Sequence, residues 1–561
     1  MNEHALRLGD VRSPWLRGVL AGLSIVVVVW VLNLTSYWNF FLDEWGFIEL
    51  RRPWHLDLIL LPHREHWSTL PILLWKVLFS TVGIRSHVPY EAALLVVHVV
   101  AVFLLFALVR RRSGDIPAFG AALILLVLGS GADGIIWAFQ VGWTGSVAFG
   151  LLAMLLLDGD PAFPGRLAPV SAALLGSLMC SSVGLAFLVA IGVELLADPR
   201  RRRLLLALVV PTAAFVAWFL AFDTGRPGYG GIEGDFLQGA TGWSYVVNLL
   251  GFIVTGLAAS AIGLAGAAGI LSVVLALVLA FLVTRAMQRR VEAWQLGMIA
   301  GTVFFFALVA TGRVQYGVDL AKESRYLYVG AVFLLPLVAH SLRSIPWRGL
   351  WRPALVAGLA VCVIGNTIRL HDAALNLIYY MGIEDAELQT VEVFRGAPDM
   401  ALDHYIDNTV VSSMYANVYL AAIDELGSPV PPMTLDGLRR LPHLAVDRVM
   451  RNLFGPSIKV ETDRARSTAG LQCRSVDSTP GAAIDLRVPA GKSFLLSSTK
   501  GGEASIYMGF LDAPTDDMVQ KVRLQAASPV WVRMPDTGKP TEWQLRIATA
   551  STGTVQLCTS S

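Results

Sequence analysis

Charged residues are scarce in this sequence: Asp, Glu, Lys and Arg make up only 15% of its 561 residues. Soluble domains carry about 25% charged residues, so this composition cannot supply an ordinary water-exposed surface. The hydrophobic fraction of 55% and the mean hydropathy of +0.59 instead predict a polytopic α-helical membrane protein. The formal net charge of +2 is too small to favour nucleic-acid binding.

Cysteine is also scarce, with four residues and no Cys-x-x-Cys or other zinc-ligand spacing. Cys180 and Cys362 fall within apolar runs, whereas Cys473 and Cys558 bracket a segment of strand-like sequence. In an oxidising compartment the second pair is expected to form a disulfide. The alternative is a pair of buried free thiols.

Apolar runs dominate the first two thirds of the chain. About eleven of them are long enough, or nearly so, to cross the ~30 Å hydrocarbon core. They lie at residues 17–38, 90–109, 116–130, 144–157, 168–182, 184–197, 204–222, 264–284, 294–312, 326–342 and 353–371. The run 68–83 is ambiguous because Lys76 stands at its centre and Pro71 near its start. We interpret it as an interfacial helix within an external loop, 39–89.

With that interpretation, every arginine cluster falls on one side of the membrane. The clusters are Arg7, Arg12 and Arg17; Arg110, Arg111 and Arg112; Arg166; Arg200 to Arg203; Arg285, Arg289 and Arg290; and Arg343, Arg348 and Arg352. Basic residues concentrate in cytoplasmic loops, so the N-terminus is predicted to be cytoplasmic and the chain after residue 371 extracytoplasmic. The first run is expected to act as an uncleaved signal anchor. Further external loops are expected at 131–143, 223–263 and 313–325.

The composition changes after Ala373, where apolar runs give way to mixed sequence. We therefore predict a membrane domain at 1–371 and an extracytoplasmic helical or mixed segment at 372–465. Residues 466–561 contain short β-rich pieces separated by Gly, Pro, Asp and Ser. This pattern predicts a β-sandwich-like domain.

Four polar groups fall on the predicted outer face. They are Asp43-Glu44, "HREH" at 63–66, "ADGIIWAFQVGW" at 132–143 and "GRVQYGVDLAKESRY" at 312–326. Each group alone has an ordinary explanation: an acidic pair can cap a helix, and His or Arg can anchor a span to lipid headgroups. Their occurrence together on one face favours a functional site.

These motifs resemble the bacterial GT-C glycosyltransferases: an acidic pair after the first span, a His-rich element before an interfacial helix, Trp137-x-x-Gln140, and Ser324-Arg325-Tyr326 opening a late span. The resemblance covers residues 17–371. It implies a GT-C-like membrane fold in a bacterial inner membrane, often with a C-terminal external domain. It also implies a polyprenyl-phosphate-linked sugar as donor and a glycan, lipid or protein of the cell envelope as acceptor.

The chemistry of such a transfer assigns roles to the polar residues. A base must take the acceptor's proton, and cationic donors must stabilise the leaving phosphate. Asp43, with Glu44 as its neighbour, suits the first role. The predicted substrate-binding residues are His63, Glu65, His66, Trp137, Gln140, Arg313, Lys322, Arg325 and Tyr326. Among them the basic side chains suit phosphate, and the aromatic rings, together with Trp143, suit a sugar face.

Three alternatives stay open at this point. A divalent metal could be held by Asp43, Glu44, His63 and His66, although no dedicated motif is present and no cofactor is expected. A lipid-linked-sugar flippase or other transporter would need polar groups along its whole path, whereas these crowd one side. An O-antigen-type polymerase or ligase would transfer a preformed glycan.

Overall fold

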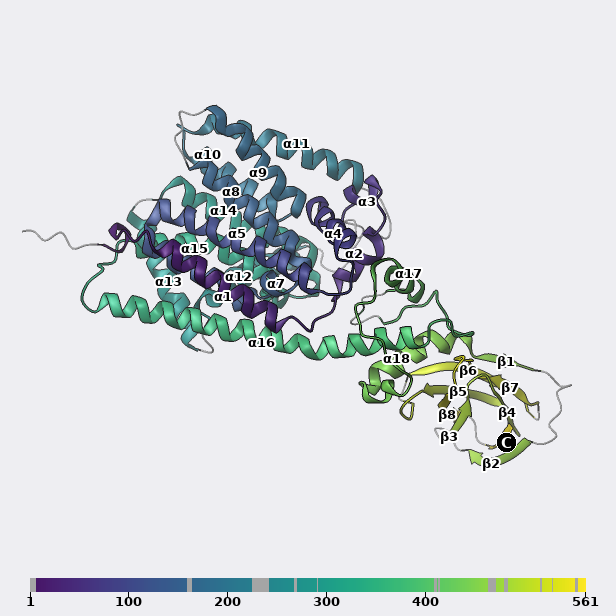
Figure 1. Ribbon diagram of the computed structural model, residues 1–561. Coiled ribbons are helices and arrows are strands. Elements are labelled where there is room, and N and C mark those ends of the chain that lie inside the picture. Colours follow the sequence, from purple (N-terminus) through teal and green to yellow (C-terminus); the bar gives the residue numbers. More distant parts are fainter. Residues whose placement is uncertain are drawn as a thin grey trace, which may run out of the picture. The chain divides into compact units, whose positions relative to one another are not determined.

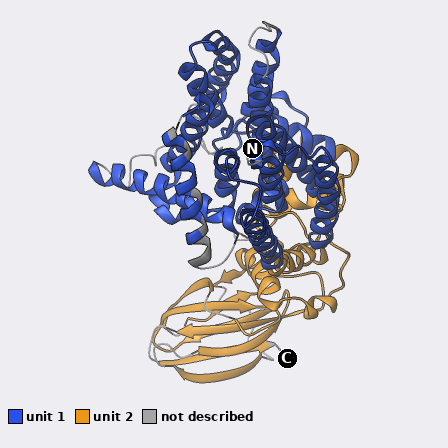
Figure 2. Ribbon diagram, turned by 90° about the vertical axis from the view of Figure 1, so that its left-hand side faces the viewer, with its two compact units in different colours: residues 1–37, 53–78, 88–377 blue, residues 38–52, 79–87, 378–561 orange. Residues whose placement is uncertain are grey.

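The computed structural model describes residues 7–158, 164–223, 242–266, 270–289, 291–407, 411, 414–462, 471–478, 483–514, 517–526, 528–549 and 553–560 (Figure 1). The chain forms two compact units (Figure 2). Unit 1 comprises residues 1–37, 53–78 and 88–377, and unit 2 comprises residues 38–52, 79–87 and 378–561. Arg290 and the predicted boundary at 465/466 lie outside the described residues.

Unit 1 is a helical bundle, as the composition predicts. Its helices are α1 (Leu16–Leu34), α3 (Leu56–Leu60), most of α4 (Thr69–Thr81), α5 (Val88–Ser113), α6 (Asp115–Leu126), α7 (Asp133–Ile136), α8 (Val141–Leu157), α9 (Leu167–Cys180), α10 (Gly184–Ala197), α11 (Val209–Trp218), α12 (Trp243–Ala265), α13 (Ile270–Arg289), α14 (Ala293–Arg313), α15 (Ser324–Leu342) and the first part of α16 (Trp351–Val393). Among the described residues, eight helical segments are long and apolar enough to cross a membrane. The helical membrane class is confirmed, whereas the predicted count of eleven spans is not established.

Helix α4 is the segment interpreted above as interfacial. Its 13 residues correspond to about 20 Å, which is shorter than the hydrocarbon core. Lys76 at its centre is buried, donates a hydrogen bond to the carbonyl of Pro53 and lies 5.0 Å from the ring centroid of Trp54. The lysine charge therefore has local protein partners. The position of α4 relative to the membrane stays a prediction.

The prediction of a loop over the whole of 223–263 is wrong in its second part, because α12 occupies residues 243–265 and is long and apolar enough to cross a membrane. The sequence from about 246 to 284 is apolar enough for two helices, whereas the hydropathy pattern predicts a single span there, at 264–284. The break comes at Gly266, whose φ of +64° ends α12 in a left-handed conformation. Glycine adopts this conformation without steric penalty.

Close packing of small residues joins α10 and α14. Gly297 and Gly301 lie one turn apart on α14, and a Cβ atom built at either would meet Ala190 of α10 at 2.5–2.9 Å. At Gly301 such an atom would also approach Ala186 and Phe333. Because lipid provides little hydrophobic driving force between helices, close backbone approach of this kind is a main source of association in membranes.

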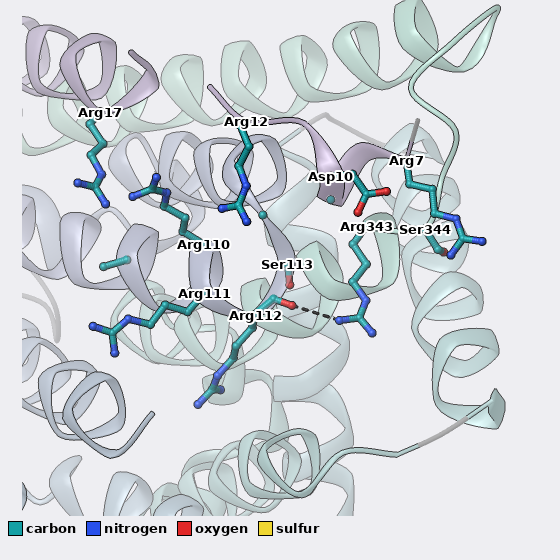
Figure 3. A pocket seen from close by; sticks show the side chains of 13 residues that line it. Arg7, Asp10, Arg12, Arg17, Arg110, Arg111, Arg112, Ser113, Arg343 and Ser344 are labelled. Carbon is teal, nitrogen blue, oxygen red and sulfur yellow. Dashed lines mark hydrogen bonds between the residues drawn. The ribbon is translucent and has the colours of Figure 1, made fainter. Parts of the chain in front are cut away.

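One end of the unit 1 bundle is rich in arginine. A cavity of about 680 Å³ at this end is lined by Arg7, Arg12, Arg17, Arg110, Arg111, Arg112 and Arg343, among other residues (Figure 3). Arg112 also forms an ion pair with Asp158 at 2.8 Å and lies 4.7 Å from the ring centroid of Trp294. The N-terminal segment, the end of α5, the end of α8 and the start of α14 therefore lie at the same end, which we call the arginine end.

Unit 2 contains α2 (Asp43–Arg51), the last part of α16, α17 (Ala416–Leu426) and α18 (His443–Phe454), followed by two antiparallel sheets. The sheet orders are β1-β7-β4-β9-β2 and β3-β8-β5-β6. The strands are β1 (Lys459–Glu461), β2 (Leu471–Ser478), β3 (Ala483–Pro489), β4 (Ser493–Ser498), β5 (Gly502–Gly509), β6 (Met518–Leu524), β7 (Val530–Arg533), β8 (Glu542–Thr549) and β9 (Gly553–Ser560). The strand-rich C-terminal domain is thus present as predicted.

The core of this domain follows from strand alternation. On β8, Trp543, Leu545 and Ile547 are buried while their neighbours are exposed or half-buried, so one face of the sheet is covered. Cys473 on β2 pairs directly with Cys558 on β9, and the two form the disulfide expected from the sequence. The covalent bond therefore joins β2, an edge strand of the five-stranded sheet, to its neighbour β9.

Candidate functional site

The "HREH" segment forms a tight turn between α3 and α4. His63 and His66 exchange two backbone hydrogen bonds, with N···O distances of 3.0 and 3.1 Å. Arg64 has a φ of +54°, the left-handed conformation that two-residue turns of this type require. The paired histidines form the base of the turn, and Arg64 and Glu65 form its tip.

The two imidazole rings are held by residues far away in the sequence. His66 Nδ1 is hydrogen-bonded to the hydroxyl of Ser182, between α9 and α10, and its ring meets Trp143 edge-on at a centroid distance of 5.5 Å. His63 is buried and packs against Phe139 at 5.2 Å. The turn is therefore anchored against the start of α8 and the junction of α9 and α10.

Aromatic rings extend the surface around His66. Trp143 of α8 lies 5.7 Å from Tyr326 of α15 and 6.1 Å from Phe305 of α14. Trp137 packs 5.4 Å from Phe139, in the segment that leads into α8. Aromatic faces have the shape and polarisability to pack on the apolar face of a sugar ring.

An ion pair connects the turn to the end of α14. Arg313 donates to Glu65 at 2.5 Å, and the two side chains are 32% and 35% exposed. Burial raises the pKa of Glu65, but its electrostatic interactions with His66, Arg313 and Arg64, together with a backbone hydrogen bond, outweigh burial and leave this pKa below its ordinary value. Glu65 is therefore an anion that keeps the guanidinium in place. We call His66, Trp143, Tyr326, Arg313 and Glu65 the turn cluster.

Asp133 and Arg325 lie together beside this cluster. The backbone N–H of Asp133 donates to the hydroxyl of Ser324 at 2.9 Å, and the Asp133 carboxylate interacts with Ser324 and Arg325 at the start of α15. Burial raises the pKa of Asp133, with Glu323 contributing in the same direction against the opposing charge of Arg325. The guanidinium carbon of Arg325 lies 5.3 Å from the ring centroid of Tyr326.

Gln140 is a buried polar residue with spare hydrogen-bonding capacity. Its side chain is 1% exposed, and within the described part of the chain its Oε1 atom accepts no hydrogen bond. A buried acceptor without a donor costs about 1–3 kcal/mol. Such a group is readily explained if a ligand hydroxyl donates to it.

The predicted site residues do not all join the turn cluster. Lys322 pairs with Asp319 at 2.6 Å on an exposed 3₁₀ segment, and both side chains are largely solvated. Asp43 and Glu44 begin α2 in unit 2. Glu44 is fully buried, accepts a hydrogen bond from the backbone of Phe41 at 2.8 Å and lies 3.2 Å from His87. These contacts are typical of a structural carboxylate, whereas Asp43 beside it is only half-buried.

Several neighbours of the site were not identified from the sequence. Ser181 and Ser182 separate two short apolar helices, and this polar break was the signal that could have found them. Phe139 and Phe305 gave no signal, because an aromatic residue within an apolar run is indistinguishable from a packing residue. Among the described residues, no group of three or more His, Cys, Asp or Glu side chains is placed to hold a metal ion.

No protein-family model and no curated protein matches the chain. Among solved structures, it is similar to ArnT from Cupriavidus metallidurans bound to undecaprenyl phosphate, with 14% identity over 76% of this chain and 90% of that chain and a TM-score of 0.47. The apo state of the same protein gives 16% identity, 74% and 85% coverage and a TM-score of 0.46. An Archaeoglobus fulgidus oligosaccharyltransferase in complex with zinc and sulfate is 14% identical over 73% of this chain and 58% of that chain, with a TM-score of 0.42. The functional proposal for this chain rests on its side chains.

Proposed function

We propose that this protein is a membrane glycosyltransferase that moves a sugar from a polyprenyl-phosphate donor to a glycan, lipid or protein acceptor of the cell envelope. The observation that carries the proposal is the turn cluster: aromatic rings from α8 and α15 meet a histidine and an arginine–glutamate pair at one place. Sugar faces and phosphate oxygens are the ligands that these two kinds of side chain bind best.

The location of the cluster supports action on the outer face. Helix α14 begins beside Arg112 at the arginine end and finishes at Arg313, and α15 begins at Ser324 and finishes next to Arg343. The turn cluster therefore lies at the end of the unit 1 bundle opposite the arginine end. Since arginine clusters favour the cytoplasmic side, the turn cluster faces outwards in this proposal.

The reaction would proceed by attack of an acceptor oxygen on the anomeric carbon of the donor. A new C–O bond forms, the bond from that carbon to the lipid phosphate breaks, and the electron pair leaves on polyprenyl phosphate. Arg313 and Arg325 would bind the phosphate as its charge increases, and Gln140 would accept a hydrogen bond from a sugar hydroxyl. The acceptor's proton passes to a carboxylate base, for which Asp43 remains the candidate on sequence grounds.

Comparing cell-envelope glycans by mass spectrometry with and without this protein is the first test. A single sugar residue should be missing without the protein, and this identifies both donor and acceptor. The purified protein in lipid nanodiscs should then release polyprenyl phosphate in step with acceptor glycosylation. Movement of the sugar lipid across a bilayer without release of polyprenyl phosphate would replace this proposal with a transporter, and transfer of a preformed glycan would indicate a polymerase or ligase.

A further inference from the structure

The arginine end contains a second candidate binding site, separate from the turn cluster. Seven of the 13 residues that line its cavity are arginines, and the only acidic residue among them is Asp10. The arginines come from three separate segments: the N-terminal stretch, the end of α5 and the turn after α15 (Figure 3). The fold, rather than one basic run of sequence, therefore brings these charges together.

Ion pairing neutralises only part of this charge. Arg110 pairs with Asp115, Arg112 with Asp158, and Arg343 approaches Glu292 at 3.5 Å. Arg12 also interacts electrostatically with Asp115, but within the part of the chain that the structure describes, neither Arg12 nor Arg17 comes within ion-pair distance of a carboxylate. Both are exposed on the cavity wall. Cavities with a surplus of guanidinium groups bind phosphate well, because each planar fork matches two phosphate oxygens.

An apolar groove of about 310 Å³ is lined by residues next in sequence to residues that line this cavity. The chain passes directly from one to the other at two places: Gly9 lines the cavity and Leu8 the groove, and Ser344 lines the cavity and Ile345 the groove. The groove walls are mainly aliphatic side chains from α6, α13, α15 and α16, together with Trp351 at the start of α16 and Trp347 in the segment before it. A cationic cavity and an apolar groove that are bordered by the same two chain segments match a molecule with a phosphate at one end and a hydrocarbon chain at the other.

We infer that this end of unit 1 binds an anionic membrane phospholipid, with its phosphate-bearing headgroup in the arginine cavity and one acyl chain in the apolar groove. The chemistry is that of phosphatidylglycerol or cardiolipin, which the arginine-rich side of a membrane protein attracts electrostatically. A zwitterionic phospholipid has the same acyl chains but no net negative charge, so it should bind this site more weakly. The site is independent of the sugar-transfer proposal, because it lies at the opposite end of α14 and α15.

The headgroup part is tested by titrating the purified full-length protein in detergent with phosphatidylglycerol and measuring bound lipid by native mass spectrometry. The double variant Arg12→Gln/Arg17→Gln should weaken binding about 10-fold or more, from the usual contribution of each basic residue near a charged lipid. Arg200→Gln/Arg203→Gln is the matched control. These two arginines are exposed and belong to the same predicted cytoplasmic side but do not line the cavity, so binding should be unchanged.

The acyl-chain part is tested by filling the groove. Gly358 of α16 lines the groove, and a Cβ atom added there meets nothing within 4 Å, so Gly358→Leu places a side chain in the space assigned to the lipid. This variant should also weaken phosphatidylglycerol binding. Gly382→Leu, on the same helix with equally open surroundings but away from the groove, should not.

Three results would overturn the inference. Equal binding of phosphatidylcholine and phosphatidylglycerol would show that the arginine charge does not select the lipid. Wild-type affinity in Arg12→Gln/Arg17→Gln would exclude the cavity as the headgroup site. The third result has two parts: inorganic phosphate raises the thermal midpoint of the protein as much as phosphatidylglycerol does, and Gly358→Leu binds phosphatidylglycerol normally. Together these would show that the cavity binds a soluble anion and that the groove holds no acyl chain.

Discussion

Replacing Arg313 by glutamine tests whether the turn cluster binds the donor phosphate or only stabilises the fold. The ion pair with Glu65 is about one-third exposed on each side, and pairs of this kind contribute about 0–1 kcal/mol to stability. The thermal midpoint of Arg313→Gln should therefore change little. Charge-assisted hydrogen bonds to a ligand are worth about 1.5–3 kcal/mol, so kcat/KM for the lipid-linked donor should fall about 10–150-fold.

Two further variants make this result interpretable. Glu65→Gln removes the anion that keeps the guanidinium in place, so its KM for the donor should rise, but by less than in Arg313→Gln, which removes the guanidinium itself. Lys322→Gln removes a nearby cation that pairs with Asp319 outside the cluster, and it should behave like the wild type. The assay is release of polyprenyl phosphate from the donor in nanodiscs. Wild-type kcat/KM in Arg313→Gln, or an equal loss in Lys322→Gln, would refute the assignment.

Three other predictions follow from single features of the chain. Asp43→Asn should reduce transfer about 10²-fold or more without changing protein level, as expected for loss of a general base; a normal rate would exclude that role. Gln140→Met should leave thermal stability unchanged or higher, because it removes a buried unpaired acceptor, yet lower the transfer rate; loss of stability would instead indicate a structural role. Serine in place of Cys473 and Cys558 should destabilise the β-domain by about 4–5 kcal/mol in chemical unfolding, and an unchanged midpoint would contradict this.

Composition and span length were sufficient to predict the helical class of unit 1, because continuous apolar runs of about 20 residues satisfy their backbone hydrogen bonds beside lipid as helices. The strand-rich domain and its disulfide could likewise be predicted from alternation and cysteine placement. Helix α12 could not be resolved in the same way, since a break at Gly266 within a continuous apolar stretch depends on a single backbone conformation. A hydropathy profile is a mean over many residues, so it does not detect a helix break at one glycine.

The candidate site was predictable only in outline. The topology predicted from the arginine clusters places His66, Arg313 and Tyr326 on one side of the membrane, and the structure brings these residues into one cluster. Topology could not distinguish Arg313, which reaches Glu65, from Lys322, which turns to Asp319. It also could not show that the carboxylate of Glu44 is buried against its own helix start. Such differences depend on side-chain packing between segments distant in sequence, which no local pattern contains.

The close contact between α10 and α14 has a consequence for how the protein can be divided. These helices lie on either side of the stretch between α11 and α12, and Gly297 and Gly301 bring the α14 backbone directly against Ala190. Two fragments cut in that stretch and synthesised separately should therefore reassemble in the membrane through this surface. Gly301→Leu, which places a side chain against Ala190, should abolish co-purification of the fragments. The chain would then behave as two complementary halves, and reporter tags on each half could follow its assembly in living cells.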